Sequence, residues 1–314
     1  MADKYINLDA NESVYFNRQL EHTKKKSYDK IFPEFTAKVR FPFNGDVDEG
    51  AESIIYHQFT EVGMGKIISD YADDLPRCDV YGKEFSSFVR TIGQSYGYTI
   101  MDVKKSALTG KALPQRKANA ARRGNDQKLE DLAWNGSEVD NILGVFSNPN
   151  ISSYTAANGA SPISPLWGGK TPTEIIKDMN DGVTYIVDLT NGVEQPDTIV
   201  LPIKQYSQIA TTNMGAGTDT TILSYFKATN PLIKTVTWDI HCKDVAPLPS
   251  GGAGPSDVMF IYKNDIDKLS LEIPLMYKQL SPEPRNLEFV INTYSRCGGV
   301  IIYYPLSVLV VEGI

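Results

Sequence analysis

The stretch that decides the fold is Met101–Gly136, MDVKKSALTGKALPQRKANAARRGNDQKLEDLAWNG. Between Pro114 and Trp134 it contains no further proline, a single glycine at Gly124, and many residues that favour helices. This composition predicts a helix over 114–134, roughly 30 Å long at about 1.5 Å per residue. Proline fits the first turn of such a helix, where its missing N–H group has no partner to lose. A shorter helix is expected before it, over about Met101–Leu108.

One face of the predicted helix is apolar but narrow. Helical spacing places five residues on this face: Ala118, Ala121, Asn125, Leu129 and Leu132. The alanines and Gly124 let another backbone approach closely, yet they bury little apolar area. The helix is therefore expected to bury only a thin stripe.

The charges of the same helix are sorted along its length. Cations come first, at Arg116, Lys117, Arg122 and Arg123, and acids follow, at Asp126, Glu130 and Asp131. This order opposes the helix dipole, which favours acids near the N-terminus and cations near the C-terminus. Arg122 and Asp126 lie one turn apart, so an ion pair between them can offset part of that cost. Two interpretations stay open: an ordinary solvated face, or two charge clusters that contact other subunits or other parts of the chain.

Length and composition indicate a globular protein. The 314 residues suffice for one large domain or two modest ones. Apolar residues make up 41% and charged residues 22%, as in ordinary folded proteins. No run approaches the roughly 18 apolar residues of a membrane helix, and the N-terminus lacks the apolar core of a secretory signal. Three widely spaced cysteines, Cys78, Cys242 and Cys297, suit a reducing compartment and give no zinc or disulfide pattern. We expect folding in a cytosol.

The formal net charge of −7 argues against a protein whose main task is to grip nucleic-acid phosphates with lysine and arginine. Local basic patches remain at Lys24–Lys26 and along Arg116–Arg123. Either patch can equally be solvated surface.

The first hundred residues divide into two kinds of sequence. Residues 1–40 are polar, with apolar residues scattered through them without a steady period, which is typical of an arm that lies on a neighbour. From 41 to 100, β-type segments punctuated by glycines predict antiparallel ribbons: Ser53–Phe59, Arg77–Tyr81, Phe85–Thr91 and Ser95–Ile100. Between them Asp70, Asp73 and Asp74 lack the spacing of a calcium loop and have no histidine beside them, so we expect no metal site.

Residues 145–170 form a long irregular stretch of the kind found at crossings and interfaces. Thr171-Pro-Thr-Glu174 then has the pattern of a capping box, which predicts a helix over 174–181, with the apolar segment 183–189 after it. Gly168-Gly-Lys170-Thr171 resembles the end of a phosphate-binding loop, but the earlier glycine and the preceding strand are missing. We interpret it as a helix cap.

Further along, Pro202 is expected to open a helix over 204–210. Another is expected within 218–229, capped by Asp219 or Thr220 and stopped by Asn230-Pro231. Three strands are expected around and after the glycine-rich loop 246–256: Lys234–Ile240, Asp257–Lys263 and Leu269–Ile273.

The C-terminal segment is the second informative region. Asn286–Tyr294 alternates as a strand, Arg296–Gly299 turns, and Val300–Tyr304 returns. A last apolar run, LSVLVVEGI, predicts that the end of the chain is packed into the fold.

No catalytic, cofactor-binding or metal-ligating constellation can be assembled. His22, His57 and His241 lie far apart and form no two-histidine motif, and neither GxSxG nor GxGxxG occurs. An enzyme is therefore unsupported.

Taken together, these features resemble a known family. The glycine-rich segment GMGKIISDYADDLPRCDVYGKEF (63–85) precedes the long helix, a mixed region follows, and Arg296-Cys-Gly-Gly-Val-Ile-Ile-Tyr-Tyr-Pro305 and Gly313-Ile314 close the chain. The combination is similar to the major capsid proteins of tailed bacteriophages with the HK97-type fold. The resemblance covers nearly the whole chain from about residue 50.

The resemblance implies an α+β fold and a division of the chain. The expected parts are an N-terminal arm at 1–40, an extended β E-loop with flanking strands at 41–100, a peripheral domain with a spine helix at 101–170, an axial domain at 171–285, and C-terminal strands returning to the peripheral domain at 286–314. Since the first strands begin by about residue 50, any scaffold is expected to be a separate protein.

The function implied is that of a major capsid protein. Hexamers and pentamers would form an icosahedral head, part of the virion, that encloses double-stranded DNA and contacts it weakly; folding and assembly would take place in the host cytoplasm. Separate scaffolding, portal and decoration proteins are possible partners, and no cofactor and no membrane are implied. Two alternatives stay open. An encapsulin-type nanocompartment would offer an inner apolar groove for a cargo peptide, and a soluble enzyme would form a small oligomer with a polar pocket.

Seven residues are candidates for subunit interfaces: Arg116, Lys117, Arg122, Arg123, Asp126, Lys66 and Lys83. The first five belong to the sorted charges of the long helix. Lys66 and Lys83 lie on the expected E-loop, where some family members form lysine–asparagine cross-links, but no partner can be assigned to them.

Overall fold

The computed structural model describes residues 33–67, 75–109, 113–160, 163–215, 217–249 and 255–314. Contacts divide the chain into two units, Met1–Glu34 and Phe35–Ile314, and every element below belongs to the second. Most of the expected arm, with His22 and Lys24–Lys26, lies outside the described residues, as do Asp70, Asp73 and Asp74.

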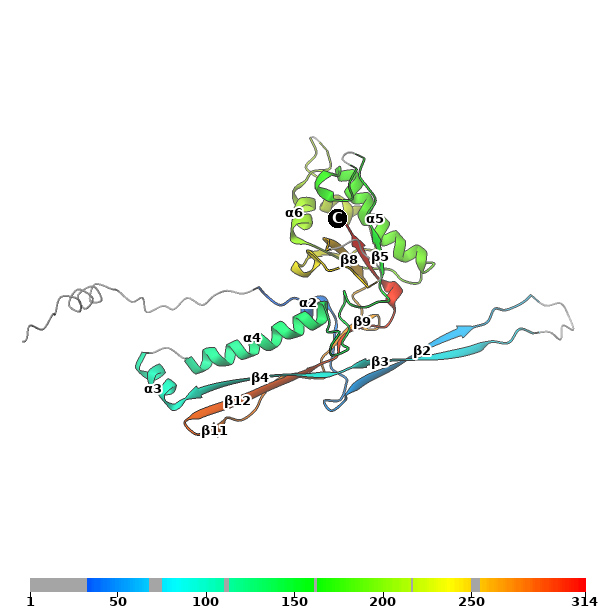
Figure 1. Cartoon of the computed structure of the whole chain (residues 1–314). Coiled ribbons are helices and arrows are strands. Elements are labelled where there is room, and N and C mark those ends of the chain that lie inside the picture. Colours follow the sequence, from blue (N-terminus) through cyan, green and yellow to red (C-terminus); the bar gives the residue numbers. More distant parts are fainter. Residues whose placement is uncertain (1–32, 68–74, 110–112, 161–162, 216, 250–254) are drawn as a thin grey trace, which may run out of the picture. The chain divides into compact units, whose positions relative to one another are not determined.

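The long helix is present where the sequence predicts it. Helix α4 spans Leu113–Trp134, and α3 (Ile100–Thr109) precedes it (Figure 1). The predicted stripe is buried at four of its five positions, from Ala121 to Leu132, while Ala118 is half-buried. Gly124 explains how closely the helix approaches its neighbour, because a Cβ there would lie 2.8 Å from Oε1 of Gln94.

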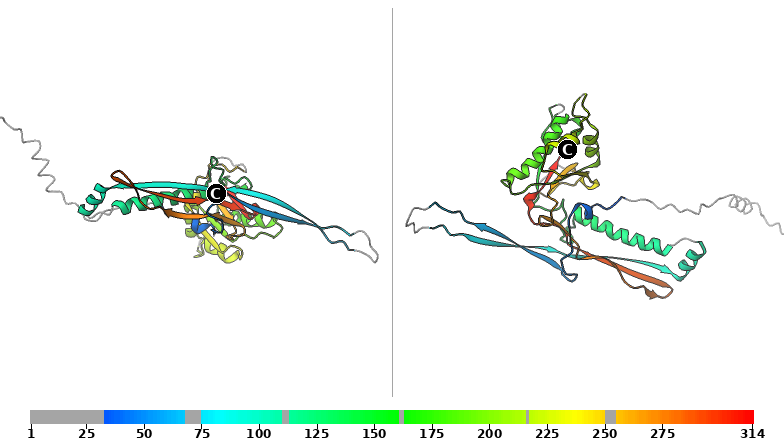
Figure 2. Two further views of the ribbon diagram at one scale, coloured as in Figure 1. Left: turned by 90° about the horizontal axis from the view of Figure 1, so that it is seen from below. Right: turned by 180° about the vertical axis from the view of Figure 1, so that it is seen from behind.

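The neighbour of α4 is an antiparallel sheet. Its strands are β4 (Arg90–Thr99), β12 (Glu288–Cys297), β10 (Leu275–Gln279) and β11 (Glu283–Arg285). Strand β12 is central: it pairs with β4 along one edge and with β10 and β11 along the other. Figure 2 shows α4 lying along this sheet. In β12 every second residue from Ile291 to Cys297 is buried, and the Ser295 hydroxyl donates to Oδ1 of Asn125 on α4 at 2.6 Å.

Strand β3 leads directly into β4 (Figure 2), but it pairs with β2 and not with a strand of this sheet. β2 (Ser53–Val62) and β3 (Asp79–Phe88) form a two-stranded antiparallel ribbon in which Ser53 faces Phe88 and Val62 faces Asp79. The sequence predicted strands here but divided them differently, since it ended one segment at Tyr81 and began the next at Phe85.

A five-stranded sheet forms the second half of the core. Its order is β5 (Ser152–Thr155), β14 (Val308–Glu312), β8 (Val258–Tyr262), β6 (Thr198–Leu201) and β7 (Thr235–Trp238). Strands β6, β8 and β14 are buried along their whole length, so their residues do not alternate between core and solvent. Such continuous apolar runs are typical of a sheet covered on both faces.

Helices cover one face of this sheet, and the C-terminal end of α4 packs against the other. Ile199, Met259 and Leu309 pack in a cluster with residues of α5 (Pro172–Leu189), α6 (Ile203–Thr211) and α7 (Ile222–Thr229). The alternate residues Val200, Phe260 and Val310 pack with Trp134 and Leu132 of α4 and with Phe41, which follows the short helix α2 (Ala37–Arg40).

The expected helices of this half are confirmed with two corrections, to the end of α5 and to the cap of α7. The Thr171–Glu174 capping box opens α5, but the helix continues through Gly182 to Leu189 instead of ending at 181. Gly182 is buried against Ile261 of the sheet, where a Cβ would lie 2.5 Å from the Ile261 side chain, so tertiary packing carries the helix past the glycine. Pro202 itself is the N-cap of α6. The cap of α7 is Thr221, whose hydroxyl accepts from the Ser224 N–H, and not Asp219 or Thr220.

A small sheet joins the two halves. It consists of β1 (Phe43–Asn44), β9 (Leu269–Glu272) and β13 (Gly299–Ile302). The sequence predicted that 300–304 would return along the preceding strand, and this is wrong, because β13 pairs with β9. Gly299 makes the change of direction, since its φ of +76° is the left-handed conformation that glycine adopts most easily.

The buried chain end is confirmed, because Ile314 is 1% exposed and β14 is an inner strand of the five-stranded sheet. Segment 286–314 thus contributes to all three of these sheets: β12 pairs with β4, β13 with β9, and β14 with β5 and β8. Three 3₁₀ turns complete the described elements: Trp167–Gly169, Ile240–Cys242 and Pro305–Ser307.

Candidate assembly surfaces

The β2–β3 ribbon exposes apolar side chains on both of its faces. Phe59 and Val80 belong to one face and are 69% and 62% exposed, while Val62 and Tyr81 belong to the other. In the part of the chain that the structure describes, neither strand pairs with any strand except the other. A two-stranded ribbon is marginally stable in water by itself. The exposed apolar residues therefore indicate a surface that another molecule covers.

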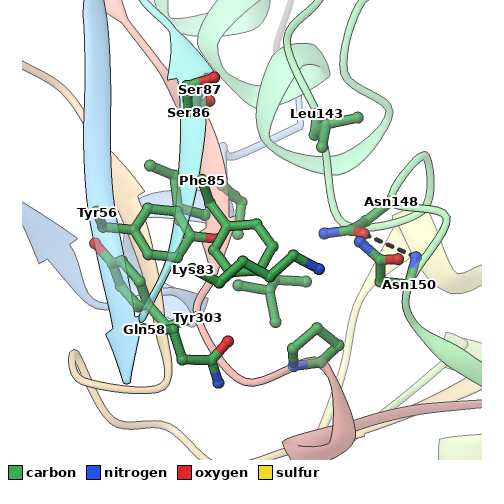
Figure 3. A pocket seen from close by; sticks show the side chains of 14 residues that line it. Tyr56, Gln58, Lys83, Phe85, Ser86, Ser87, Leu143, Asn148, Asn150 and Tyr303 are labelled. Carbon is green, nitrogen blue, oxygen red and sulfur yellow. Dashed lines mark hydrogen bonds between the residues drawn. The ribbon is translucent and has the colours of Figure 1, made fainter. Parts of the chain in front are cut away.

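The inner end of the ribbon is fastened to the fold by aromatic rings. Tyr56 of β2 stacks on Phe85 of β3 with ring centroids 5.3 Å apart, and meets Tyr303 edge to face at 5.0 Å (Figure 3). The Tyr303 hydroxyl in turn lies 3.1 Å from Oε1 of the buried Glu272 on β9. Burial raises the pKa of Tyr56 and, first among several causes, that of Tyr303, so both phenols are neutral at physiological pH.

The candidate residues of α4 differ in how far they are exposed. Arg116 and Arg122 are exposed and Arg123 is half-buried. Lys117 is used within the subunit, because its ammonium donates to the Gly97 carbonyl at 2.8 Å and lies 3.3 Å from Oδ2 of Asp102.

Asp126 is the second candidate that is used internally. Its carboxylate forms an ion pair with Lys38 at 2.9 Å. The ion pair with Arg122 that the spacing allowed is not formed; α2, which contains Lys38, supplies the cation instead. Lys66 and Lys83 are exposed on the ribbon and its connecting segment, so the structure does not gather the seven candidates into one site.

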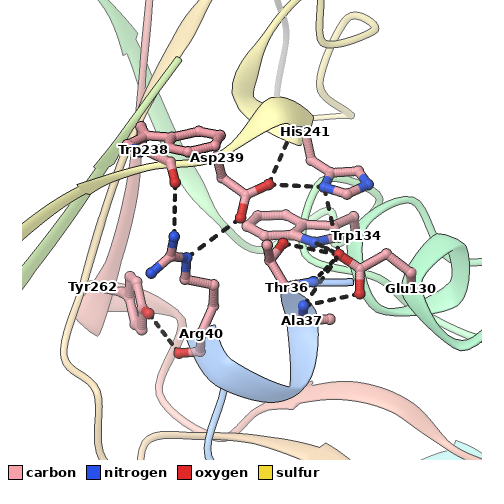
Figure 4. A network of polar contacts seen from close by, with 9 residues as sticks. All are labelled: Thr36, Ala37, Arg40, Glu130, Trp134, Trp238, Asp239, His241 and Tyr262. Atoms are coloured by element: carbon pink, nitrogen blue, oxygen red, sulfur yellow. Dashed lines mark hydrogen bonds and ion pairs between the residues drawn. The ribbon is translucent and has the colours of Figure 1, made fainter. Parts of the chain in front are cut away.

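The acidic end of α4 is the centre of a polar network that the sequence interpretation did not identify (Figure 4). Glu130 is 5% exposed, and its carboxylate accepts hydrogen bonds from the Thr36 N–H at 2.8 Å, the Thr36 hydroxyl at 2.9 Å and the Ala37 N–H at 2.9 Å. The Trp134 indole N–H donates to it at 3.3 Å. The carboxylate thus caps the N-terminus of α2, where helix N–H groups have no partner of their own.

A second carboxylate extends the network to the segment that follows β7. Asp239 is fully buried; the His241 ring nitrogen Nδ1 lies 2.8 Å from its Oδ1, and the Arg40 guanidinium lies 3.4 Å from its Oδ2. Burial alone would raise the pKa of Asp239, but neighbouring groups, His241 first among them, outweigh it and hold this pKa below its ordinary value. His241 also stacks on Trp134, with ring centroids 5.2 Å apart and planes 9° apart.

This junction joins three segments that are distant in sequence, namely 36–41, 130–134 and 238–241. We call these segments the N-terminal junction. Among the acids of the sorted charges, Asp126 and Glu130 contact another part of the same chain, whereas Asp131 pairs with Lys128 on the same helix. The only hint in the sequence was the apolar surroundings of Glu130, between Leu129 and Trp134.

Lys170, the residue that resembled a phosphate-binding lysine, lies in a buried ion pair. Its ammonium is 2.5 Å from Oδ2 of Asp178, and the Trp167 indole N–H donates to the same oxygen at 2.9 Å. Lys170 is 8% exposed, so it does not face a ligand. The interpretation of this segment as a helix cap is confirmed by the Thr171 capping box.

The described residues contain no group of three or more histidine, cysteine, aspartate or glutamate side chains that could hold a metal ion. Cys78, Cys242 and Cys297 are free thiols, and burial raises the pKa of the latter two. Within the described ranges no helix combines the length and the hydropathy required to cross a membrane.

Solved structures with similar architecture include a phage capsid and a virus-like particle. The capsid of Myoviridae phage XM1 superimposes with a TM-score of 0.78 at 17% identity, over 95% of this chain and 98% of that one. A protein of Mycobacterium phage Bobi gives 0.63 at 11%, over 96% and 99%. The virus-like particle of Pyrococcus furiosus gives 0.51 at 12%, over 87% and 90%. The class of protein is therefore defined by the α+β HK97-like fold of capsid proteins.

The family follows from the sequence itself. The family model described as "Major capsid protein" matches residues 63–314, and the chain belongs to this family. Comparison with curated protein sequences gives no match. The protein is thus a structural capsid shell protein, a component of the virion and not an enzyme.

Proposed function

We propose that this chain assembles as hexamers and pentamers into an icosahedral phage head that encloses double-stranded DNA. The observation that carries the proposal is the β2–β3 ribbon, which exposes Phe59, Val62 and Val80 and has no strand partner outside itself among the described residues. A closed shell built from many copies would cover such a ribbon on every subunit by the same repeated contact.

The proposed shell contacts its DNA weakly. The net charge of −7 supports this, because tight binding to phosphates would need a surplus of cations. The exposed residues Arg116 and Arg122 on α4 are candidates for contacts between subunits.

We assign each segment of the chain to one part of the proposed capsid fold. Residues 1–40 act as an arm, 41–100 as the E-loop with its flanking strands, and 101–170 as the peripheral domain around α4. Residues 171–285 form the axial domain, and 286–314 return to the peripheral sheet through β12, although β13 and β14 join the other two sheets. Assembly takes place in the host cytoplasm, with separate scaffolding, portal and decoration proteins as possible partners.

Size-exclusion chromatography of the purified protein, followed by negative-stain microscopy of the void fraction, tests the proposal. Shells, tubes or capsomer rings are expected. Nuclease treatment then separates the two kinds of shell, because a phage head protects DNA, whereas an encapsulin-type compartment would contain a protein cargo. A small oligomer that does not assemble at high concentration or with a crowding agent would refute the proposal.

A further inference from the structure

A pocket of about 290 Å³ opens at the inner end of the ribbon (Figure 3). Three parts of the chain line it: strands β2 and β3, the segment from β13 to Pro305, and the loop that contains Leu143, Asn148 and Asn150. The rings of Tyr56, Phe85 and Tyr303 form part of its wall.

The lining of this pocket carries a single charged side chain, and its charge is positive. Lys83 is the charged residue of its lining, and Gln58, Asn148 and Asn150 add side-chain amides; no carboxylate belongs to the lining. Figure 3 shows the Lys83 side chain extending across the pocket toward Asn148 and Asn150. Its ammonium lies 4.9 Å from the centre of the Phe85 ring, and no carboxylate of the described residues lies within 4.0 Å of it.

These groups fit a carboxylate. An ammonium and amide N–H groups donate charge-assisted hydrogen bonds to carboxylate oxygens. The aromatic walls exclude part of the water, which strengthens the attraction relative to an open surface. The buried acid Glu272 does not fill this role, because it does not line the pocket and its Oε1 accepts from the Tyr303 hydroxyl.

A carboxylate donor of the right kind is present on the chain itself. The turn at 45–52 contains four acids, Asp46, Asp48, Glu49 and Glu52, all of them exposed. None of these carboxylates forms an ion pair with another described residue, and none belongs to the lining of the pocket. The Arg296 guanidinium donates to the Glu49 carbonyl and so fixes the backbone of the turn.

We propose that the Lys83 pocket of one subunit binds a carboxylate from the acidic turn 45–52 of a second copy of this chain. The inference rests on the shell function proposed above and adds the pair of surfaces that makes one of its contacts. Because pocket and turn are different surfaces of the chain, the contact is heterologous and can repeat from copy to copy, as a ring or a shell requires.

Substitution of Lys83 tests the pocket. K83R retains the charge, K83M removes it but keeps the aliphatic stem over Phe85, and K83E reverses it. Under conditions in which the wild-type protein forms particles, the particle yield should be close to wild type for K83R and reduced for K83M. For K83E it should fall by at least about tenfold, since like charges in a contact are strongly unfavourable. The control K104E makes the same charge reversal at an exposed residue of α3 and should assemble normally.

A second measurement identifies the partner and does not depend on any variant. Particles assembled from equal amounts of ¹⁴N- and ¹⁵N-labelled wild-type protein are treated with a carbodiimide, which joins amines to adjacent carboxylates. Mass spectrometry should find Lys83 joined to an acid of 45–52, with mixed isotope labels that show a link between two copies. Reversing the charge of the turn as E49K in the K83E background should restore part of the assembly.

The outcomes separate the two proposals. Wild-type protein that forms no particles refutes the shell function, and this contact with it. If wild-type protein forms particles, two results leave the shell function intact and overturn the contact. One is normal assembly of K83E; the other is Lys83 linked only within one copy or only to acids outside 45–52.

Discussion

Replacing Glu130 with alanine should detach the segment around α2 from the rest of the fold. In the structure one carboxylate accepts from the Thr36 N–H, the Thr36 hydroxyl, the Ala37 N–H and the Trp134 indole. The Ala37 and Trp134 donors are buried, and each would lose its partner at a cost of about 1–3 kcal/mol. Water can solvate the half-buried Thr36, so we expect a total loss of about 3–5 kcal/mol in the free energy of unfolding.

Two assays on the same assembly state measure this effect. At about 2–4 °C per kcal/mol for a large domain, the melting temperature of E130A should fall by about 10 °C. Limited trypsin digestion should also cut more rapidly after Lys38 and Arg40, because the backbone of α2 is released together with its cap. The digestion reports on the N-terminal junction itself, while the melting temperature reports on the whole fold.

Asp131 supplies a matched control. It follows Glu130 directly and pairs with Lys128 at 2.9 Å, but both side chains are 47% exposed. Such a surface ion pair contributes at most about 1 kcal/mol, so D131A should melt close to wild type and resist trypsin equally well. Equal melting temperatures and equal cleavage rates for E130A and D131A would refute the role assigned to Glu130.

Three further predictions concern other charged groups. In K170M the Asp178 carboxylate stays buried without its cation, which should cost about 3–5 kcal/mol in urea unfolding, and the K170M/D178N double variant should recover part of the loss. If the exposed Arg122 lies in an interface, the R122E variant should have a free energy of unfolding within about 1 kcal/mol of wild type but give fewer particles on size-exclusion chromatography. A normal particle yield would remove Arg122 from the interface. The pKa of Asp239 is held below its ordinary value, so this carboxylate stabilises the fold above about pH 4, and the contribution is lost as the pH falls through the lowered pKa. The difference in unfolding free energy between wild type and D239N should therefore shrink from pH 7 to pH 3. A constant difference would contradict the assignment.

The sequence predicted those elements whose limits depend on local chemistry. The ends of α4 follow from Pro114 and from the change in composition after Trp134, and the start of α5 follows from the Thr171–Glu174 capping box. Both signals act within one or two turns of the chain. The buried C-terminal strand was equally predictable, because its apolar run has no other place in a folded protein.

Strand partners and some boundaries could not be predicted in the same way. The pairing of Glu288 with Thr99 brings together residues almost two hundred positions apart, and no local pattern specifies it. The continuation of α5 through Gly182 depends on contact with Ile261, and the departure of β13 from β12 depends on the conformation of Gly299. These features are properties of the tertiary packing.

The candidate interface residues show the same limit. Charge sorting on α4 drew attention to this helix, but it could not say which charges have partners within the same subunit. Lys117 and Asp126 have partners within the subunit, whereas Arg122 is exposed. Lys83 was selected only for its place on the expected E-loop; the pocket around it is formed by a distant loop and by β13.

The central claim is that the protein forms a closed shell in which the β2–β3 ribbon of each copy lies on another copy. Electron cryomicroscopy of the assembled wild-type protein tests it most directly. We expect particles with icosahedral symmetry, built of hexamers and pentamers, in which Phe59 and Val80 are covered by a neighbouring subunit. Particles in which the ribbon stays exposed to solvent, or a protein that forms only small oligomers, would contradict it.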